Sequence, residues 1–269
     1  MKLLSSLTSL LLSGLLSTAW AEAPADPLNS VMWEYVHEVH LDQAPVVFDS
    51  KVEVHLPASA EDSMQVPVSA RWNGSERVEE IRLIADLNPI IRVLSYEPVK
   101  ARPSIAVRFK VQQGTIVRAA MRTTDGVWHV NGAYIDAAGG GCTTPSASQM
   151  MASWEDHYGE LHAQVWPGEA NTDRLRFQMM HPMDTGLSDG IPKFIIETVE
   201  VHDASTEELL GRITLHEPVA ENPMITLDPQ HAVEGYRVSF RDNNGLHVSG
   251  VIESHSQIPE LLAGQFPMQ

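Results

Sequence analysis

The sequence predicts an all-β protein built as two antiparallel β-sandwich units, with a short helix near the N-terminus. Three observations lead to this. Short segments of alternating apolar and polar residues recur along the chain with turn signals between them. One segment of small residues divides these strands into two series. Hydrophobic residues make up 43% of the 269 residues, which is enough for a folded core.

The composition excludes several classes of protein. The chain has 35 acidic and 18 basic residues, for a net charge of −17. Such a charge repels nucleic acid phosphates and anionic membranes, so we expect no nucleic-acid partner. The single cysteine, Cys142, excludes an internal disulfide, a cysteine-rich zinc site and an iron–sulfur cluster. We therefore expect no cofactor or resident metal.

Residues 1–21 are predicted to be a cleavable signal peptide. Lys2 supplies the positive start, an apolar stretch follows over residues 3–16, and Ala19-Trp20-Ala21 matches the cleavage pattern. The stretch is short and rich in serine, which disfavours the alternative of an uncleaved anchor helix. We expect export to a periplasm and no membrane insertion after cleavage. Such a compartment oxidises thiols.

Residues 22–136 are predicted to form the first sandwich unit. Asp26-Pro27 reads as a helix start, with the helix running to about Val39. Turn signals stand at Asn73-Gly74 and at Asp125-Gly126. The expected strands cover residues 46–48, 52–56, 66–72, 81–85, 105–109, 115–119 and 127–130.

Residues 137–149 are small and flexible and predict a linker, followed by a second unit at residues 150–255 and a tail at 256–269. The expected strands of the second unit cover residues 161–166, 175–180, 194–201, 209–215, 224–227, 236–240 and 246–251. Residues 22–149 carry 11 basic and 16 acidic side chains, whereas residues 150–269 carry 6 basic and 19 acidic side chains. The second unit is therefore the acidic one. Its charge is typical of a solubilising surface or of a docking face for a basic partner.

Cys142 follows Gly139, Gly140 and Gly141 within this linker. Glycines allow a chain to move and to enter a narrow cleft, so the segment could project the thiol about 10–13 Å from the last strand. A catalytic cysteine needs a rigid position and a group that lowers its pKa, and no such group is adjacent in sequence. The residues alone leave two readings, an incidental linker cysteine and a carrier thiol.

Other candidate sites are weaker. Methionines and a histidine at Met179, Met180, His181 and Met183 are the soft ligands that Cu(I) prefers, although a strand end explains them equally well. His37 and His40 have the spacing of half a metal site, but no second pair completes it. Six basic residues precede the linker and could meet anionic cargo or the acidic second unit. They are Lys100, Arg102, Arg108, Lys110, Arg118 and Arg122.

Several segments resemble SoxY, the carrier subunit of the periplasmic sulfur-oxidation system. They are residues 48–52, 57–62, 66–68, 84–89 and 124–128, followed by Gly140-Gly141-Cys142. The second unit resembles SoxZ, the partner of SoxY. Its matching segments are HPMDTG at 181–186, Asn222-Pro223 and the closing hairpin at 240–251. Together they are similar to fused SoxYZ-like carriers associated with quinoprotein dehydrogenases.

The resemblance implies two immunoglobulin-like sandwiches and a carrier that is not an enzyme. It implies that Cys142 holds a covalently bound sulfur species, with Gly139, Gly140 and Gly141 as the arm. The expected partners are periplasmic redox enzymes of sulfur oxidation, a cytochrome c or a quinoprotein dehydrogenase. In SoxY the arm ends the chain, whereas here Thr143-Thr144-Pro145 continue it, which puts thiosulfate as the cargo in doubt. The alternatives are a non-covalent scaffold for such enzymes and a copper-binding module.

Overall fold

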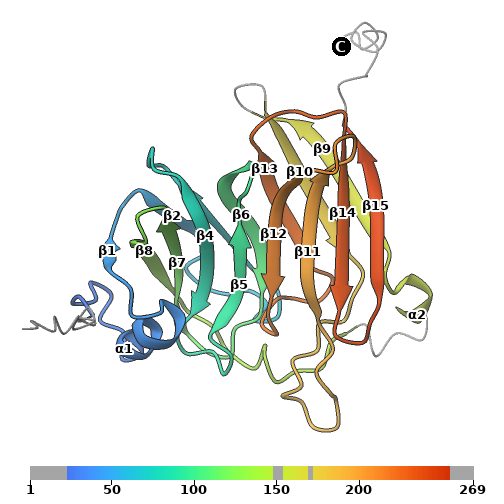
Figure 1. The fold of residues 1–269 in the computed structure, drawn as a ribbon. Coiled ribbons are helices and arrows are strands. Elements are labelled where there is room, and N and C mark those ends of the chain that lie inside the picture. Colours follow the sequence, from blue (N-terminus) through green and yellow to red (C-terminus); the bar gives the residue numbers. More distant parts are fainter. Residues whose placement is uncertain (1–22, 148–153, 169–171, 255–269) are drawn as a thin grey trace, which may run out of the picture.

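The computed structural model describes residues 23–147, 154–168 and 172–254. Nearly all of its regular structure is β, in two sheets that face each other across a hydrophobic core (Figure 1). This confirms the predicted all-β sandwich class with a short N-terminal helix. The predicted signal peptide and tail lie outside the described residues. Within them, no helix is long and apolar enough to cross a membrane.

The first part of the chain contributes a short helix and eight strands. The helix consists of α1 (Trp33–Tyr35) and a π-helical turn, η1 (Val36–His40). The strands are β1 (Val46–Phe48), β2 (Val52–His55), β3 (Val66–Trp72), β4 (Val78–Ala85), β5 (Arg92–Glu97), β6 (Ala101–Phe109), β7 (Thr115–Thr123) and β8 (Trp128–Ile135).

The second part contributes α2 (Trp154–His157) and seven strands. They are β9 (Leu161–Pro167), β10 (Asp173–Met179), β11 (Ile196–Asp203), β12 (Leu209–Leu215), β13 (Met224–Pro229), β14 (Gly235–Asp242) and β15 (His247–Glu253). The turn predicted at Asp125-Gly126 is confirmed, because Gly126 adopts positive φ between β7 and β8. Gly245 does the same between β14 and β15.

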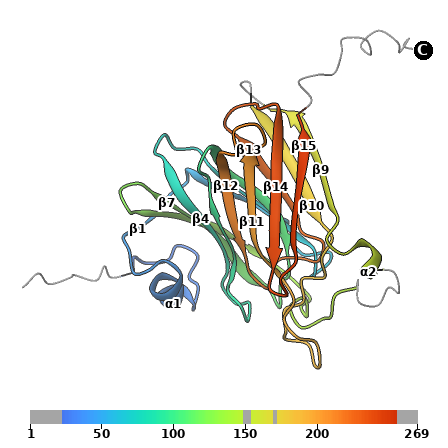
Figure 2. The same cartoon turned by 45° about the vertical axis from the view of Figure 1, so that its right-hand side comes forward.

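Both sheets contain strands from both halves of the chain. The nine-stranded sheet has the order β1-β8-β7-β4-β5-β12-β11-β14-β15, and the six-stranded sheet has the order β2-β3-β6-β13-β10-β9. The halves meet where β5 pairs with β12 and where β6 pairs with β13 (Figures 1 and 2). We call these two pairings the seam. A single hydrophobic cluster runs between the sheets through both halves.

The sequence located every described strand except β5. Arg92–Glu97 does not alternate regularly, because Val93 and Leu94 are both buried and the pairing of β4 with β5 shifts register between Leu83 and Ile84. The missed strand is one of the four that form the seam.

The N-terminal helix begins later than predicted. The sequence placed its start at Asp26-Pro27, but the chain becomes helical only at Trp33. The carboxylate of Asp26 instead accepts hydrogen bonds from the backbone N–H groups of Leu28 (3.1 Å) and Ser30 (2.9 Å), which fold this segment into turns. The helix then packs against the outer side of the nine-stranded sheet, where Trp33 and Val36 contact Trp128 and its neighbours.

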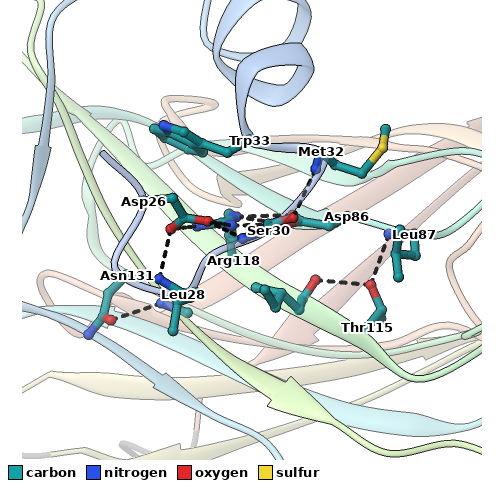
Figure 3. A network of polar contacts seen from close by, with 12 residues as sticks. Asp26, Leu28, Ser30, Met32, Trp33, Asp86, Leu87, Thr115, Arg118 and Asn131 are labelled. Carbon is teal, nitrogen blue, oxygen red and sulfur yellow. Dashed lines mark hydrogen bonds and ion pairs between the residues drawn. The ribbon is translucent and has the colours of Figure 1, made fainter. Parts of the chain in front are cut away.

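Arg118 of β7 attaches this N-terminal segment to the sheet (Figure 3). Its fully buried guanidinium pairs with Asp26 (2.6 Å) and Asp86 (2.9 Å) and lies 4.9 Å from the ring of Trp33. Burial opposes ionisation of Asp26, but hydrogen bonds from Arg118, Ser30 and Leu28 outweigh it and lower the pKa of this carboxyl group. The network therefore favours the charged form of Asp26 beneath the helix.

Replacing Arg118 with leucine is expected to destabilise the protein by about 3–5 kcal/mol, because the buried carboxylates of Asp26 and Asp86 would lose the positive charge that pairs with them. Urea unfolding of the full chain measures the change. Arg71→Leu is the matched control, since this exposed arginine should change stability by no more than about 0.5 kcal/mol. Equal stability of the two variants would contradict the assigned role of Arg118.

Candidate functional site

Cys142 lies in a loop that leaves β8 and folds back against the chain after β6. The N–H of Gly140 donates to the carbonyl of Gln112 (3.1 Å), and that of Gly141 donates to the carbonyl of Val111 (3.0 Å). The thiol is 1% exposed, and its Sγ lies 3.7 Å from the carbonyl oxygen of Lys110. The structure thus holds the predicted arm in a closed conformation rather than projecting it into solvent.

The three glycines make this closed packing possible. Gly139 and Gly140 adopt φ angles of 100° and 84°, which other residues avoid. A side chain at Gly141 would place its Cβ 2.1 Å from the carbonyl oxygen of Ser63. From the sequence, these glycines were predicted to make the segment mobile. In the structure they also allow the loop to pack closely against the segment around Ser63.

The second half of the chain holds the loop in place. Thr185 Oγ1 donates to the carbonyl of Cys142 (2.6 Å), and Ser188 Oγ donates to the carbonyl of Thr143 (2.6 Å). The carboxylate of Asp184 accepts from the N–H of Ser146 (3.1 Å). We call Asp184, Thr185 and Ser188 the latch. Two of its members belong to the HPMDTG motif at 181–186.

The rest of that motif is packed inward. His181 Nδ1 accepts from the N–H of Met183 (3.0 Å), and its Nε2 lies 3.5 Å from Asp242. The sulfur of Met183 in turn accepts from the N–H of Ile196 (3.2 Å). Burial lowers the pKa of His181 to about 4. Because Nδ1 of His181 and the sulfur of Met183 already accept hydrogen bonds, the copper hypothesis gains no support from the geometry.

The histidine pair of the N-terminal helix is not assembled as a metal site either. His37 Nε2 lies 3.0 Å from the carbonyl of Ala44, while the ring of His40 packs against Tyr35. Over residues 23–147, 154–168 and 172–254, no group of three histidine, cysteine or acidic side chains is placed to hold a metal ion.

Lys110 is the residue beside Cys142 that the sequence analysis did not assign to the site. It appeared there only as one of six basic residues. Its buried ammonium donates to the carbonyl of Met183 in the second half. Burial lowers the pKa of Lys110 to about 8, although Asp184 and Cys142 oppose this shift. The position of this lysine between the loop and the latch follows from the tertiary structure and not from its place in the sequence.

Burial raises the pKa of Cys142 to about 11, and the charge of Lys110 offsets only part of this effect. The thiol is therefore protonated at neutral pH in the closed loop. Since the thiolate is the nucleophile, Cys142 reacts slowly while the loop is closed.

Comparisons with known proteins identify a family for the first half. Residues 37–142 match the model of the family described as sulfur oxidation protein SoxY. No match was found among curated proteins. Among solved structures, the sulfur carrier protein SoxY from Chlorobium limicola f thiosulfatophilum aligns with 40% of this chain and 96% of its own, at 13% identity and a TM-score of 0.36. A β-glucuronidase from Parabacteroides merdae aligns with 77% of this chain and 24% of its own, at 9% identity and a TM-score of 0.24.

Residues 37–142 are thus a SoxY family domain, which confirms that part of the resemblance. The match is to a family of carrier proteins, in agreement with the prediction that the chain is not an enzyme. It ends on Cys142 itself. It does not extend into the second half, so the resemblance of that half to SoxZ stays a prediction.

Native Cys142 is expected to react with iodoacetamide about a hundredfold more slowly at pH 8 than the same cysteine in urea. A pKa raised from 9 to about 11 reduces the thiolate fraction by that factor, and burial slows access further. Mass spectrometry over a time course measures both rates. Equal rates in the native and unfolded chains would contradict the closed loop.

Replacing Thr185 with valine is expected to raise the native alkylation rate of Cys142 about fivefold. The variant loses one hydrogen bond to the loop, worth about 1 kcal/mol, and so favours the open conformation. Thr214→Val on the exposed side of β12 is the control and should leave the rate unchanged. A similar acceleration in both variants would indicate general destabilisation rather than release of the latch.

Proposed function

We propose that this protein is a periplasmic carrier that holds a covalently bound sulfur intermediate on Cys142 and presents it to partner redox enzymes. The observation that carries the proposal is that the SoxY family match ends on the only cysteine of the chain. Gly139, Gly140 and Gly141 serve as the arm. The export signal predicted for residues 1–21 supports the periplasmic location.

The closed loop gives the carrier a resting state. In the described part of the chain, Thr185 and Ser188 bind the loop carbonyls of Cys142 and Thr143, and each such hydrogen bond stabilises the closed state by about 1 kcal/mol. The N–H groups of Gly140 and Gly141 add two hydrogen bonds to the chain after β6. Opening the loop therefore costs far less than unfolding the core. While closed, the protonated thiol is protected from oxidants in the compartment.

Loading the thiol favours the open state. Sγ is packed against the carbonyl of Lys110 and has 1% exposure, so a group attached to it does not fit the closed conformation. A loaded carrier is thus shifted toward an open loop that a partner enzyme can reach, whereas an unloaded carrier closes again. Loading itself, and release, require the partner redox enzymes.

A scaffold role is the second candidate, and the acidic excess of the second half favours it. Residues 150–269 carry 19 acidic and 6 basic side chains, which suits docking of a basic cytochrome c or a quinoprotein dehydrogenase. Binding of this kind needs no thiol and weakens with salt.

Intact-mass spectrometry of the protein isolated from its native cells tests the carrier role. We expect adducts that increase the mass by sulfur-containing groups, that disappear on reduction, and that are lacking in Cys142→Ser. Thr214→Val on the exposed side of β12 is the control, since it leaves the thiol and the residues that bind its loop in place. A persistently unmodified thiol during sulfur turnover, together with full function of Cys142→Ser, would overturn the carrier role and leave the scaffold role.

A further inference from the structure

The outer face of the six-stranded sheet is basic, although the chain as a whole has a charge of −17. Five arginines occupy strand positions that alternate with core residues and therefore point away from the core. They are Arg71 on β3, Arg102 and Arg108 on β6, and Arg174 and Arg176 on β10. We call this set the arginine face. Two carboxylates lie on the described strands of the same face, and each is beside a basic group. Glu53 lies beside His55, and Asp228 lies beside Arg174.

Strand pairing brings these arginines together across the seam. Arg108 lies opposite Pro67, and Ala106 lies opposite Thr226, which in turn lies opposite Arg176. The central positions therefore carry small side chains while arginines stand on both sides. The result is a groove of about 590 Å³ between Arg108 and Arg176, with Ser69, Ala106 and Thr226 in its floor. A second hollow of about 310 Å³ is lined by Arg71, Arg102 and Arg174.

The guanidinium groups are available to a ligand to different degrees. Arg71 and Arg108 are exposed, and neither makes a side-chain hydrogen bond or ion pair within the described part of the chain. Arg176 is held in position, because its Nε donates to Thr226 (3.2 Å) and its guanidinium lies 5.3 Å from the ring of Trp166. Arg108 shares the first groove with Arg176, and Arg71 shares the second hollow with Arg102 and Arg174. A carboxylate bound in either hollow would relieve the repulsion between these like charges.

We propose that the arginine face binds an extended acidic segment of a partner protein. Arginine forks match carboxylates in geometry, which favours a segment rich in aspartate or glutamate. Two open hollows in one face suit a chain segment lying across the strands, whereas a small ligand is usually enclosed. Pro57, Pro67 and Met224 add apolar contact surface to the groove.

The groove also leads toward the cysteine loop. Pro57, Pro67 and Arg108 line both the groove and an adjoining hollow of about 360 Å³, whose other lining residues come from the segment 59–66 at positions 59–62, 65 and 66. Within that segment, the carbonyl of Ser63 accepts from the N–H of Val111 (2.8 Å), and its hydroxyl accepts from the N–H of Gly139 (3.3 Å). A partner segment on the arginine face therefore lies beside the segment that contacts the arm.

Fluorescence anisotropy with a fluorescein-labelled decaglutamate peptide tests this proposal on the full chain at 50 mM salt. We expect saturable binding that weakens with added salt and that falls about tenfold or more in the double variant Arg71→Glu/Arg108→Glu. Arg241→Glu, an exposed arginine on β14 of the other sheet, is the control and should bind normally. Both variants change exposed side chains, and circular dichroism confirms that they fold.

Three outcomes would overturn the proposal. The first is no binding at 50 mM salt, and the second is an equal loss in the Arg241→Glu control. The third is displacement of the peptide by citrate when citrate is present at no higher a concentration than the peptide itself needs for saturation. That result would identify a site for small anions instead. Cys142→Ser is expected to bind the peptide normally, so failure of this proposal is distinguishable from failure of the carrier role.

Discussion

The pairing of β5 with β12 and of β6 with β13 is the constraint on which the rest of the structure depends. These pairings join the two halves into two continuous sheets around one core. The contact between the two halves continues at the end of β6. The N–H of Lys110 donates to the carbonyl of Pro218 (2.6 Å), and the N–H of Ala220 donates to the carbonyl of Arg108 (3.0 Å). The cysteine loop and the latch therefore meet only because the seam is formed. A change that opened the seam would separate Cys142 from Thr185 without altering either residue.

The site combines a strongly stabilised frame with a weakly stabilised loop. The frame is held by burial of large side chains between two sheets, to which Phe109 and Val111 contribute beside the site. The loop contains three glycines, which bury little apolar surface and lose much conformational entropy on ordering. The free energy of local opening is therefore small for the loop that carries the thiol and large for the strands around it. This contrast suits a group that must be exposed repeatedly while its surroundings stay folded.

Alternation and turn residues were sufficient to predict most of the strands, because each strand carries its own periodic signal. β5 was missed because its signal is broken by the adjacent buried residues Val93 and Leu94. The identity of the thiol could be predicted from its being the only cysteine, but its burial could not. The groups that bury it, Lys110 and Thr185, are 32 and 43 residues away in the sequence. Their approach depends on pairing across the seam, which no local pattern encodes.

Tethering at both ends limits how far the thiol can travel. On one side Asp136 is bonded to the segment near Ala58 and Ala60, and on the other Ser146 is bonded to Asp184. Cys142 is four residues from Ser146, so while that anchor holds, the thiol can rise by about 13 Å at most. A free C-terminal arm of the same composition has no such second anchor. In the proposed carrier role, an enzyme that acts on Cys142 would therefore need a shallow site or would have to displace Ser146 from the latch. Both requirements place the partner close against the seam, because the loop cannot bridge a wide gap.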